Sequence, residues 1–497
     1  MRAATFARLV APVLLSGLLY GCLLGPNYER PKLDVPETFR FAYGDAADVV
    51  NTAWWEQFQD PVLNDLVKTA LQNNLNVKQA AARVDEFMGQ FVSTRSALFP
   101  QASVGLNAGR ERASQNGPTA IPAGVSPVFN EFQAGLSGAW NIDLFGLVRR
   151  ETEAARANVN AAEQGRRATI LTLVASVASS YILLRSLDTQ LEIAQSTTAS
   201  RADSVHVFTL RRQFGQVSEM ELAQSQSDYE ATAATIPQLE QQIAQQEDAL
   251  SVLLGSNPEP ILRGRALGAL AAPTVPAGIP SELLDRRPDL LQAEQNLIAQ
   301  NALIGAARAL YFPQISLTGF FGSLSTQFSN LFTGPARVWS YAGAVTMPIF
   351  EGGNIYGQNK QAEARQQEAL FAYENAVQVA FQQVADSLIS VQKTREQLTV
   401  QDRQVSSLRT YLRLARLRYE GGYTSYLEVL DAERNLFNAE LQYTQTQAAT
   451  LTSVVSLYMA MGGGWVVQAE QMTVPPTASA QSQPQGAASQ PAAQEPQ

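Results

Sequence analysis

Hydrophobic residues recur along the chain at two different periods, and the longest stretches have the helical one. In 352–420 the apolar positions, three or four residues apart, are Leu370, Tyr373, Val377, Phe381, Val384, Leu388 and Val391. A series in the first half has the same spacing and consists of Leu173, Val177, Tyr181, Leu184, Leu187 and Leu191. No proline interrupts 128–236 or 349–474, and proline costs a helix interior ~3 kcal/mol. The pattern predicts very long helices with a narrow apolar seam, as in coiled coils.

Shorter segments have a period of two. Apolar residues alternate with small or polar ones in four expected strands, at about 98–109, 130–144, 311–322 and 336–349. Aromatic residues, among them Trp140, Trp339 and Tyr341, lie on the apolar side. This alternation is typical of transmembrane β-barrel strands, although a half-buried soluble sheet alternates in the same way. Four strands cannot close a barrel, so the pattern predicts an oligomer, and a conducting pore favours three copies with twelve strands over two with eight.

The chain contains one internal repeat. Leu98-Phe99-Pro100-Gln101 returns as Tyr311-Phe312-Pro313-Gln314, and Gly215-Gln216-Val217-Ser218 returns as Gly422-Tyr423-Thr424-Ser425. We expect a first repeat at 61–255 and a second at 281–463, each running helix, strand pair, long helix, turn, helix. A Pro- and Gly-rich linker at 256–280 joins them. A segment at 22–60 precedes the repeats, and a segment at 464–497 follows them and ends in a disordered tail of Pro, Gln, Ala and Ser.

The amino terminus has the pattern of a signal peptide. Two arginines precede an apolar run at 9–20, which is shorter than the ~20 residues that a membrane-spanning helix needs. Leu19-Tyr20-Gly21-Cys22 resembles the lipobox of bacterial lipoproteins, which implies removal of 1–21 and acylation of Cys22. The alternative is a plain secreted protein with a stray cysteine. No later stretch approaches ~18 consecutive apolar residues, so any spanning part should be a β-barrel.

Composition excludes several functions. The 497 residues include 36 Lys and Arg against 45 Asp and Glu, and this acidic balance argues against nucleic-acid binding. One His and one Cys are too few for a His/Cys metal site or a disulfide framework, and a Ser-His-Asp relay would need that one His well placed. We therefore expect no catalysis, no metal and no cofactor. A lipid-anchored enzyme that acts through paired carboxylates is the alternative.

Two helix–turn–helix segments carry the candidate site. Their cap and turn residues are Gly215, Ser218 and Glu221 in the first and Gly421, Gly422, Ser425 and Glu428 in the second. The glycines are expected to end the long helices in the left-handed conformation, and each Ser-x-x-Glu predicts a capping box for the next helix.

Two further residues in the second turn share a helix face. Leu427 and Asp431 are four positions apart. If that face meets the axis of a trimer, it forms a ring of leucines and a ring of carboxylates, which is a plausible cation-leaning gate. The alternative for Asp431 is a solvated pair with Arg434.

Short motifs occur through nearly the whole mature chain. They are Gly25-Pro26-Asn27-Tyr28-x-Arg30-Pro31, Trp54-Trp55-x-x-Phe58-x-Asp60-Pro61, Arg286-Arg287-Pro288-Asp289-Leu290, Gln292-Ala293-Glu294, Phe312-Pro313, Phe350-Glu351-Gly352-Gly353, and Arg418-Tyr419 through Asp431-Ala432. In this order they resemble TolC-like outer-membrane efflux factors of the OprM/NodT lipoprotein branch. The resemblance implies an α+β membrane protein, a homotrimer whose 12-stranded β-barrel, four strands per chain, continues into a long periplasmic α-helical barrel. The linker would lie in its equatorial region.

The resemblance also implies a function. The protein would be the outer-membrane channel of a tripartite efflux system, a passive duct for drugs that an inner-membrane pump, often of the RND type, delivers through a periplasmic adaptor. Leu427 and Asp431 look like the constriction of its periplasmic gate, Glu221 like the counterpart in the first repeat, and Tyr419 like a tyrosine that tethers helices in the closed state. The alternatives are the duct of a type I secretion system and a periplasmic adaptor lipoprotein.

Overall fold

The chain forms two compact units. The computed structural model describes residues 23–33, 36, 38–41, 53–114, 124, 126–273, 280–462 and 466–473, so the expected signal peptide at 1–21, Cys22 and the expected tail lie outside the described residues. Unit 1 contains 1–32, 86–161 and 293–373, and unit 2 contains 33–85, 162–292 and 374–497. Each unit therefore collects parts of both sequence repeats, so the compact units and the repeats divide the chain differently.

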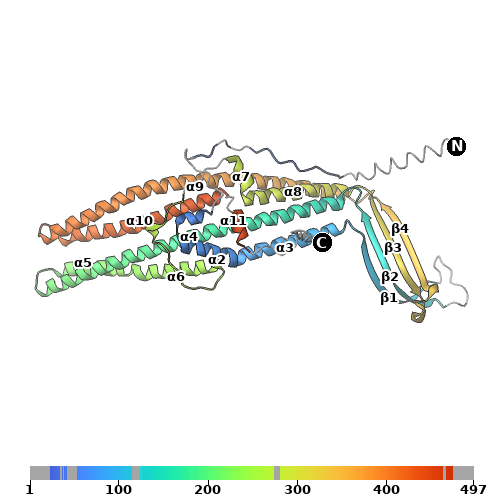
Figure 1. Ribbon diagram of the computed structural model, residues 1–497, viewed down its shortest axis with the longest axis horizontal. Helices are drawn as coiled ribbons and strands as arrows, with labels where there is room; N and C mark the ends of the chain where they lie inside the picture. Colours follow the sequence, from blue (N-terminus) through green and yellow to red (C-terminus); the bar gives the residue numbers. More distant parts are fainter. Residues whose placement is uncertain are drawn as a thin grey trace, which may run out of the picture. The chain divides into compact units, whose positions relative to one another are not determined.

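Unit 1 contains a four-stranded antiparallel sheet in the order β1-β2-β3-β4 (Figure 1). Its strands are β1 (Gln101–Arg112), β2 (Val128–Ile142), β3 (Gln314–Ser325) and β4 (Arg337–Thr346). All four lie within a few residues of their expected positions. The two repeats meet where β2 pairs with β3. β4 ends earlier than expected, at Thr346, which pairs with Gln314, the first residue of its partner strand β3.

The strand register separates the two faces of the sheet. Val104, Leu136, Phe321 and Trp339 are successive cross-strand partners, and all four side chains are exposed. The opposite face carries small and polar residues, such as the row Ser103, Ser137, Phe320 and Ser340. Phe320 is the large member of that row, and its ring occupies the space beside Gly135 and Gly322, where a Cβ would come within 2.5 and 2.8 Å of it. The alternation predicted from the sequence is confirmed.

The other elements of unit 1 are helical. They are α3 (Leu75–Ser96), which begins in unit 2, α8 (Pro288–Ala309), the starts of α4 (Leu147–Gln213) and α9 (Asn354–Glu420), and the short η3 (Phe328–Asn330) and η4 (Gly334–Ala336). Alanines at 154 and 157 of α4 pack on alanines at 299 and 302 of α8. Side chains this small let two helix backbones approach closely.

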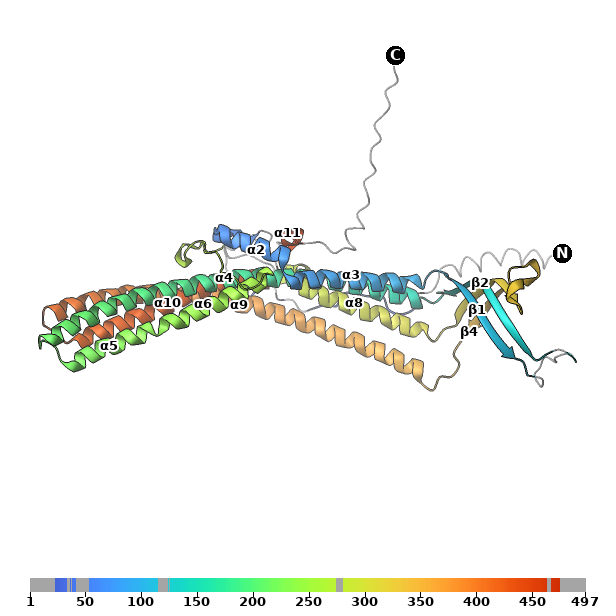
Figure 2. The same ribbon diagram turned by 90° about the horizontal axis from the view of Figure 1, so that it is seen from below.

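Unit 2 is mostly helical, and α10 runs back along α9 while α5 and α6 run back along α4 (Figures 1 and 2). Its further elements are η1 (Trp54–Phe58), α2 (Pro61–Asn73), α5 (Glu219–Ala233), α6 (Thr235–Leu254), η2 (Leu267–Ala269), α7 (Pro280–Arg286), α10 (Tyr426–Ala460) and α11 (Val466–Gln471). The returning helix of the first repeat is broken at Ala234, close to Pro237, whereas α10 is continuous. Proline is tolerated in the first turn of a helix but not in its interior.

The expected apolar seams are buried. Tyr181 and Leu184 of α4 and Tyr373 and Val384 of α9 are fully buried. Among the described helices, α4 is long and apolar enough to cross a membrane by length and composition, but 67% of its most apolar stretch is buried inside the protein. That stretch therefore serves as a packing surface.

One buried carboxylate holds the start of α2, α4 and the linker together in unit 2. Asp60 caps α2 by accepting from the Val62 N–H at 2.9 Å. It also accepts from the Tyr181 hydroxyl at 2.8 Å and from the Arg265 N–H at 2.9 Å. Gly264 leaves room for this carboxylate, which a Cβ would overlap. These contacts fix the described part of the linker on the helices.

Candidate functional site: the helical turns

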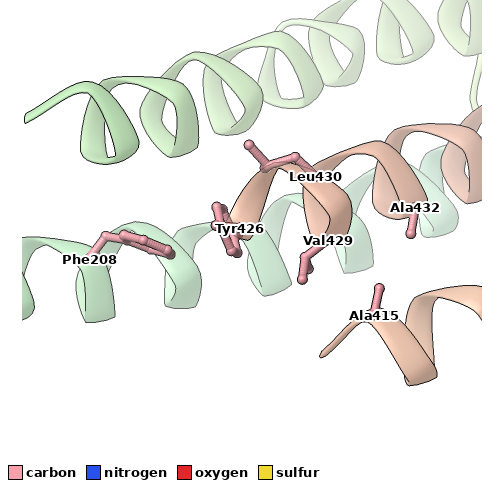
Figure 3. Close-up of a cluster of buried hydrophobic side chains, with 6 residues drawn as sticks. All are labelled: Phe208, Ala415, Tyr426, Val429, Leu430 and Ala432. Atoms are coloured by element: carbon pink, nitrogen blue, oxygen red, sulfur yellow. The ribbon is translucent and has the colours of Figure 1, made fainter. Parts of the chain in front are cut away.

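A small apolar cluster supports the turns at the ends of α4 and α9. Its buried members are Phe208 of α4, Ala415 of α9, and Tyr426, Val429, Leu430 and Ala432 of α10. Figure 3 shows Val429 and Ala432 pointing from α10 toward Ala415. The cluster is built from three helices, so it fixes the start of α10 relative to the ends of both long helices.

Both long helices end at a left-handed glycine, as predicted. Gly215 has φ 70° and Gly422 has φ 73°. In each turn an N–H donates back five residues at 2.9 Å, from Gln216 to the Arg211 carbonyl and from Tyr423 to the Arg418 carbonyl. This is the Schellman geometry, in which only glycine avoids a Cβ penalty.

Gly421 lies in the turn after α9, as expected, but it is Gly422 that adopts the left-handed conformation. Gly421 lies outside the left-handed region, and its N–H donates to the Leu417 carbonyl at 3.0 Å, as in a continuing helix. A single left-handed residue is sufficient to end a helix, and Gly422 supplies it.

The first capping box forms and the second does not. Ser218 accepts from the Glu221 N–H at 3.2 Å, while the Ser218 N–H donates to the Glu221 carboxylate at 2.8 Å. Ser425 occupies the N-cap of α10, but its side chain makes no capping hydrogen bond. The Glu428 carboxylate accepts instead from Arg418 at 2.9 Å and from the Thr424 hydroxyl. A guanidinium is the stronger partner for a carboxylate, which explains the difference.

Tyr419 links the ends of the two long helices. Its hydroxyl accepts from the Arg211 guanidinium at 3.0 Å, and its ring lies 6.3 Å from Phe208 and 5.2 Å from Tyr426, between centroids. The tyrosine at the end of α9 therefore has both a polar and an apolar contact with α4.

Leu427 and Asp431 lie next to each other on an exposed face of α10. Leu427 is 57% exposed, and the two residues line a shallow hollow together with Ser425, Glu428 and Arg434. Asp431 accepts from Asn435 at 3.1 Å and from the Tyr411 hydroxyl at 3.3 Å. The alternative pair of Asp431 with Arg434 is wrong, because Arg434 binds Asp228 at 2.6 Å.

Sequence reasoning missed a buried charge network behind this face. Asp228 of α5 is almost fully buried and binds Arg201 of α4 at 3.1 Å in addition to Arg434. Arg416 of α9 binds the buried Glu433 of α10 at 2.7 Å. Burial lowers the pKa of the Arg201 guanidinium, while Asp228 raises it. A charged residue on a long helix looks solvated in the sequence, so only helix packing could reveal this network.

The described surface beside the turn before α10 combines the apolar Leu427, the acidic Glu428 and Asp431, and the polar Ser425 and Arg434. Within the described ranges, no group of three or more His, Cys, Asp or Glu side chains lies together as metal ligands do.

Comparison with known proteins assigns the family. The family model described as outer membrane efflux protein matches residues 66–256 and 279–463. The chain is 35% identical over 462 residues to the toluene efflux pump outer membrane protein TtgC of Pseudomonas putida, covering 91% of this chain and 95% of that protein. It is 36% identical over 459 residues to the cation efflux system protein CusC of Escherichia coli, covering 91% and 98%.

Solved structures agree with this assignment. The open state of the Neisseria gonorrhoeae MtrE outer membrane channel is 31% identical, with a TM-score of 0.80, and the match covers 89% of this chain and 99% of that one. The fold class and the outer-membrane efflux function expected from the sequence are confirmed. The chain belongs to the family of outer membrane efflux proteins.

Proposed function

We propose that three copies of the chain form a passive exit duct. The sheet carries this proposal, because one of its faces is apolar and exposed in register across four strands while the other is small and polar. β1 and β4 have no outer neighbour within the described residues. Three copies would pair these edges into a twelve-stranded barrel with its apolar face toward lipid and its polar face toward a channel. Such a duct works without catalysis.

The duct would act between two partners and a lipid. A periplasmic adaptor and an inner-membrane pump, of the RND type, would deliver the cargo to the helical end. Acylation of Cys22, which lies outside the described residues, would add a lipid anchor in the outer membrane. Two relatives of nearly equal similarity, at 35% and 36% identity, have names that refer to toluene and to cations, so the similarity assigns neither cargo to this chain. Drug efflux and antibiotic resistance are the expected role.

The gate would lie at the turn before α10. The exposure of Leu427 and Asp431 on one face supports this, since a trimer would bring three copies of each to its axis. Tyr419 would hold the closed state through Arg211. Glu221 forms the first capping box with Ser218. We therefore expect Glu221 to contribute less to the gate than Leu427 and Asp431 do.

Single-channel conductance in planar bilayers tests the gate. We expect a small, cation-leaning conductance for the wild type, a larger one for Leu427→Ala, and a larger one without cation preference for Asp431→Ala. The matched control is Asp203→Ala, which removes an exposed carboxylate from α4. If neither substitution changes the conductance or the cation preference, the result would contradict the proposed gate but not the proposed duct. Folded trimers that never conduct, even with both substitutions combined, would contradict the duct.

A further inference from the structure

The amino-terminal arm, residues 23–33, lies on unit 1 through a series of polar contacts. The Asn301 amide of α8 donates to the Pro26 carbonyl at 3.1 Å. About two turns earlier in α8, Glu294 accepts from the Tyr28 hydroxyl at 3.0 Å and binds Arg30 at 3.0 Å. Hydrogen bonds of this kind are directional, so they define one path for the arm.

The centre of this path is a buried arginine of α4. Arg150 is 1% exposed, and its Nε donates to the Leu24 carbonyl at 2.9 Å. Its Nη2 donates to the Gly25 carbonyl at 3.3 Å and to the Asn27 side-chain oxygen at 3.0 Å. Its Nη1 binds Glu153 at 2.8 Å. A buried guanidinium is stable only when its donors are satisfied, and here three of the four acceptors belong to the arm.

Two glycines allow the arm to approach this closely. Gly25 has φ 91°, and a Cβ on it would overlap the backbone of Gly305 in α8. A Cβ on Gly305 would lie 2.5 Å from the Leu24 carbonyl oxygen and 2.8 Å from Arg150 Nε. Neither position accepts a side chain while the arm is seated. The seat therefore leaves room only for the backbone of the arm, and Arg150 supplies hydrogen-bond donors to the carbonyls of that backbone.

We propose that Arg150 and Gly305 form the seat of the amino-terminal arm, and that Arg150 is the positioning residue for the lipid anchor. The link to the anchor rests on the proposed acylation of Cys22. Leu24 follows Cys22 by two residues, a span of at most about 7 Å of extended chain. The Leu24 N–H donates to the Phe145 carbonyl at 3.4 Å, just beyond the end of β2. The seat thus sets where the chain from the anchor reaches unit 1.

Hydrogen exchange of the full-length protein in detergent tests the seat. We expect the Leu24 amide, which donates to the Phe145 carbonyl, to exchange about tenfold faster or more in Arg150→Met and in Gly305→Ala, because both variants release the arm. Arg150→Lys should restore part of the protection, since it keeps the charge with fewer donors. The controls are Arg156→Met, an exposed arginine of α4, and Gly89→Ala, a glycine of α3 with open space around it.

Three outcomes would overturn the proposal. The first is an arm that stays as protected in both variants as in the wild type. The second is faster exchange that spreads equally through α3 and the sheet, because Arg150 would then be only a core residue. The third is equal loss in the control variants. Gly305→Ala keeps the charge of Arg150 in place, so this variant still tests the proposal if Arg150→Met fails to fold.

Palmitate labelling separates this proposal from the proposed function. Label on the wild type and none on Cys22→Ser is the expected result and supports the role in anchoring. No label on the wild type would overturn the role of Arg150 in lipid positioning and the lipid part of the proposed function. The exchange data would still decide whether the arm has a seat.

Discussion

The hydroxyl of Tyr419 makes a polar contact between the ends of α4 and α9. Tyr419→Phe removes the acceptor for Arg211 and keeps the ring among its aromatic neighbours. We expect a loss of about 0.5–1.5 kcal/mol in the free energy of unfolding, the usual value of one hydrogen bond. Thermal unfolding followed by circular dichroism measures it. Tyr423→Phe, which alters the neighbouring exposed tyrosine, is the control, and equal stability of both variants would refute the link.

One glutamate of α4 makes stability depend on pH. Burial, and then the nearby Asp143 carboxylate, raise the pKa of Glu151 above its ordinary value of 4.5. The folded chain therefore holds this proton more tightly than the unfolded chain, and the stability it contributes is lost as pH rises through the raised pKa. We expect Glu151→Gln to melt at a higher temperature than the wild type at pH 8 and at the same temperature at pH 4. A melting difference that is independent of pH, or that also occurs in the exposed Glu192→Gln, would contradict this assignment.

At the scale of elements, the end of α9 depends on one glycine of a pair. Gly422→Ala places a side chain at φ 73°, which costs about 1–2 kcal/mol. Gly421→Ala should cost much less, because its backbone is helical and its new Cβ meets mainly the ring of the exposed, movable Tyr423. Chemical unfolding of the two variants measures the difference. Equal losses would show that the turn does not end as the structure indicates.

The helix α4 differs from α9 in the number of its buried arginines. Four of the arginines of α4 are buried, namely Arg150, Arg166, Arg185 and Arg201. Each of them contacts a different segment of the chain. These segments are, in the same order, the arm, α11, the linker and the end of α5. α9 is described throughout, and none of its arginines is buried. The two long helices match in length, but of the two only α4 carries buried charges.

At the scale of the whole molecule, the two faces of the sheet should differ in what they tolerate. Phe321→Arg puts a charge on the face proposed to meet lipid, which costs about 2–4 kcal/mol near the middle of a bilayer. Ser137→Arg puts the same charge on the opposite face of the neighbouring strand, where we expect little loss. The amount of heat-modifiable oligomer in the outer-membrane fraction measures both. Equal yields would contradict the assignment of the faces.

Much of the architecture could be predicted because it depends on local rules. The seam residues Tyr181 and Tyr373 repeat with the helical period, and both are buried as expected. The strands alternate, and their register aligns Leu136 with Phe321. Gly215 and Gly422 end their helices because a left-handed residue is a property of the backbone. Ser218 and Glu221 form their cap because both partners lie in one turn of chain.

The polar partners could not be predicted in the same way. Ser425 and Glu428 have the same spacing as the first capping box, yet Arg418, ten residues before Glu428, takes the carboxylate. Arg434 binds Asp228, 206 residues away in the sequence, rather than Asp431. Nothing local distinguishes a solvated charge from one that a second helix will cover.

The sequence by itself determined the elements, their order, the repeat and the two faces of the sheet, since period and backbone sterics act within a few residues. It also carried the motifs that identify the family. Only the tertiary structure decided which charges are buried, that Arg150 receives the amino-terminal arm, and that both repeats contribute to each compact unit. Those features depend on which helix faces which, and a pairwise contact between distant segments has no signature in either segment alone.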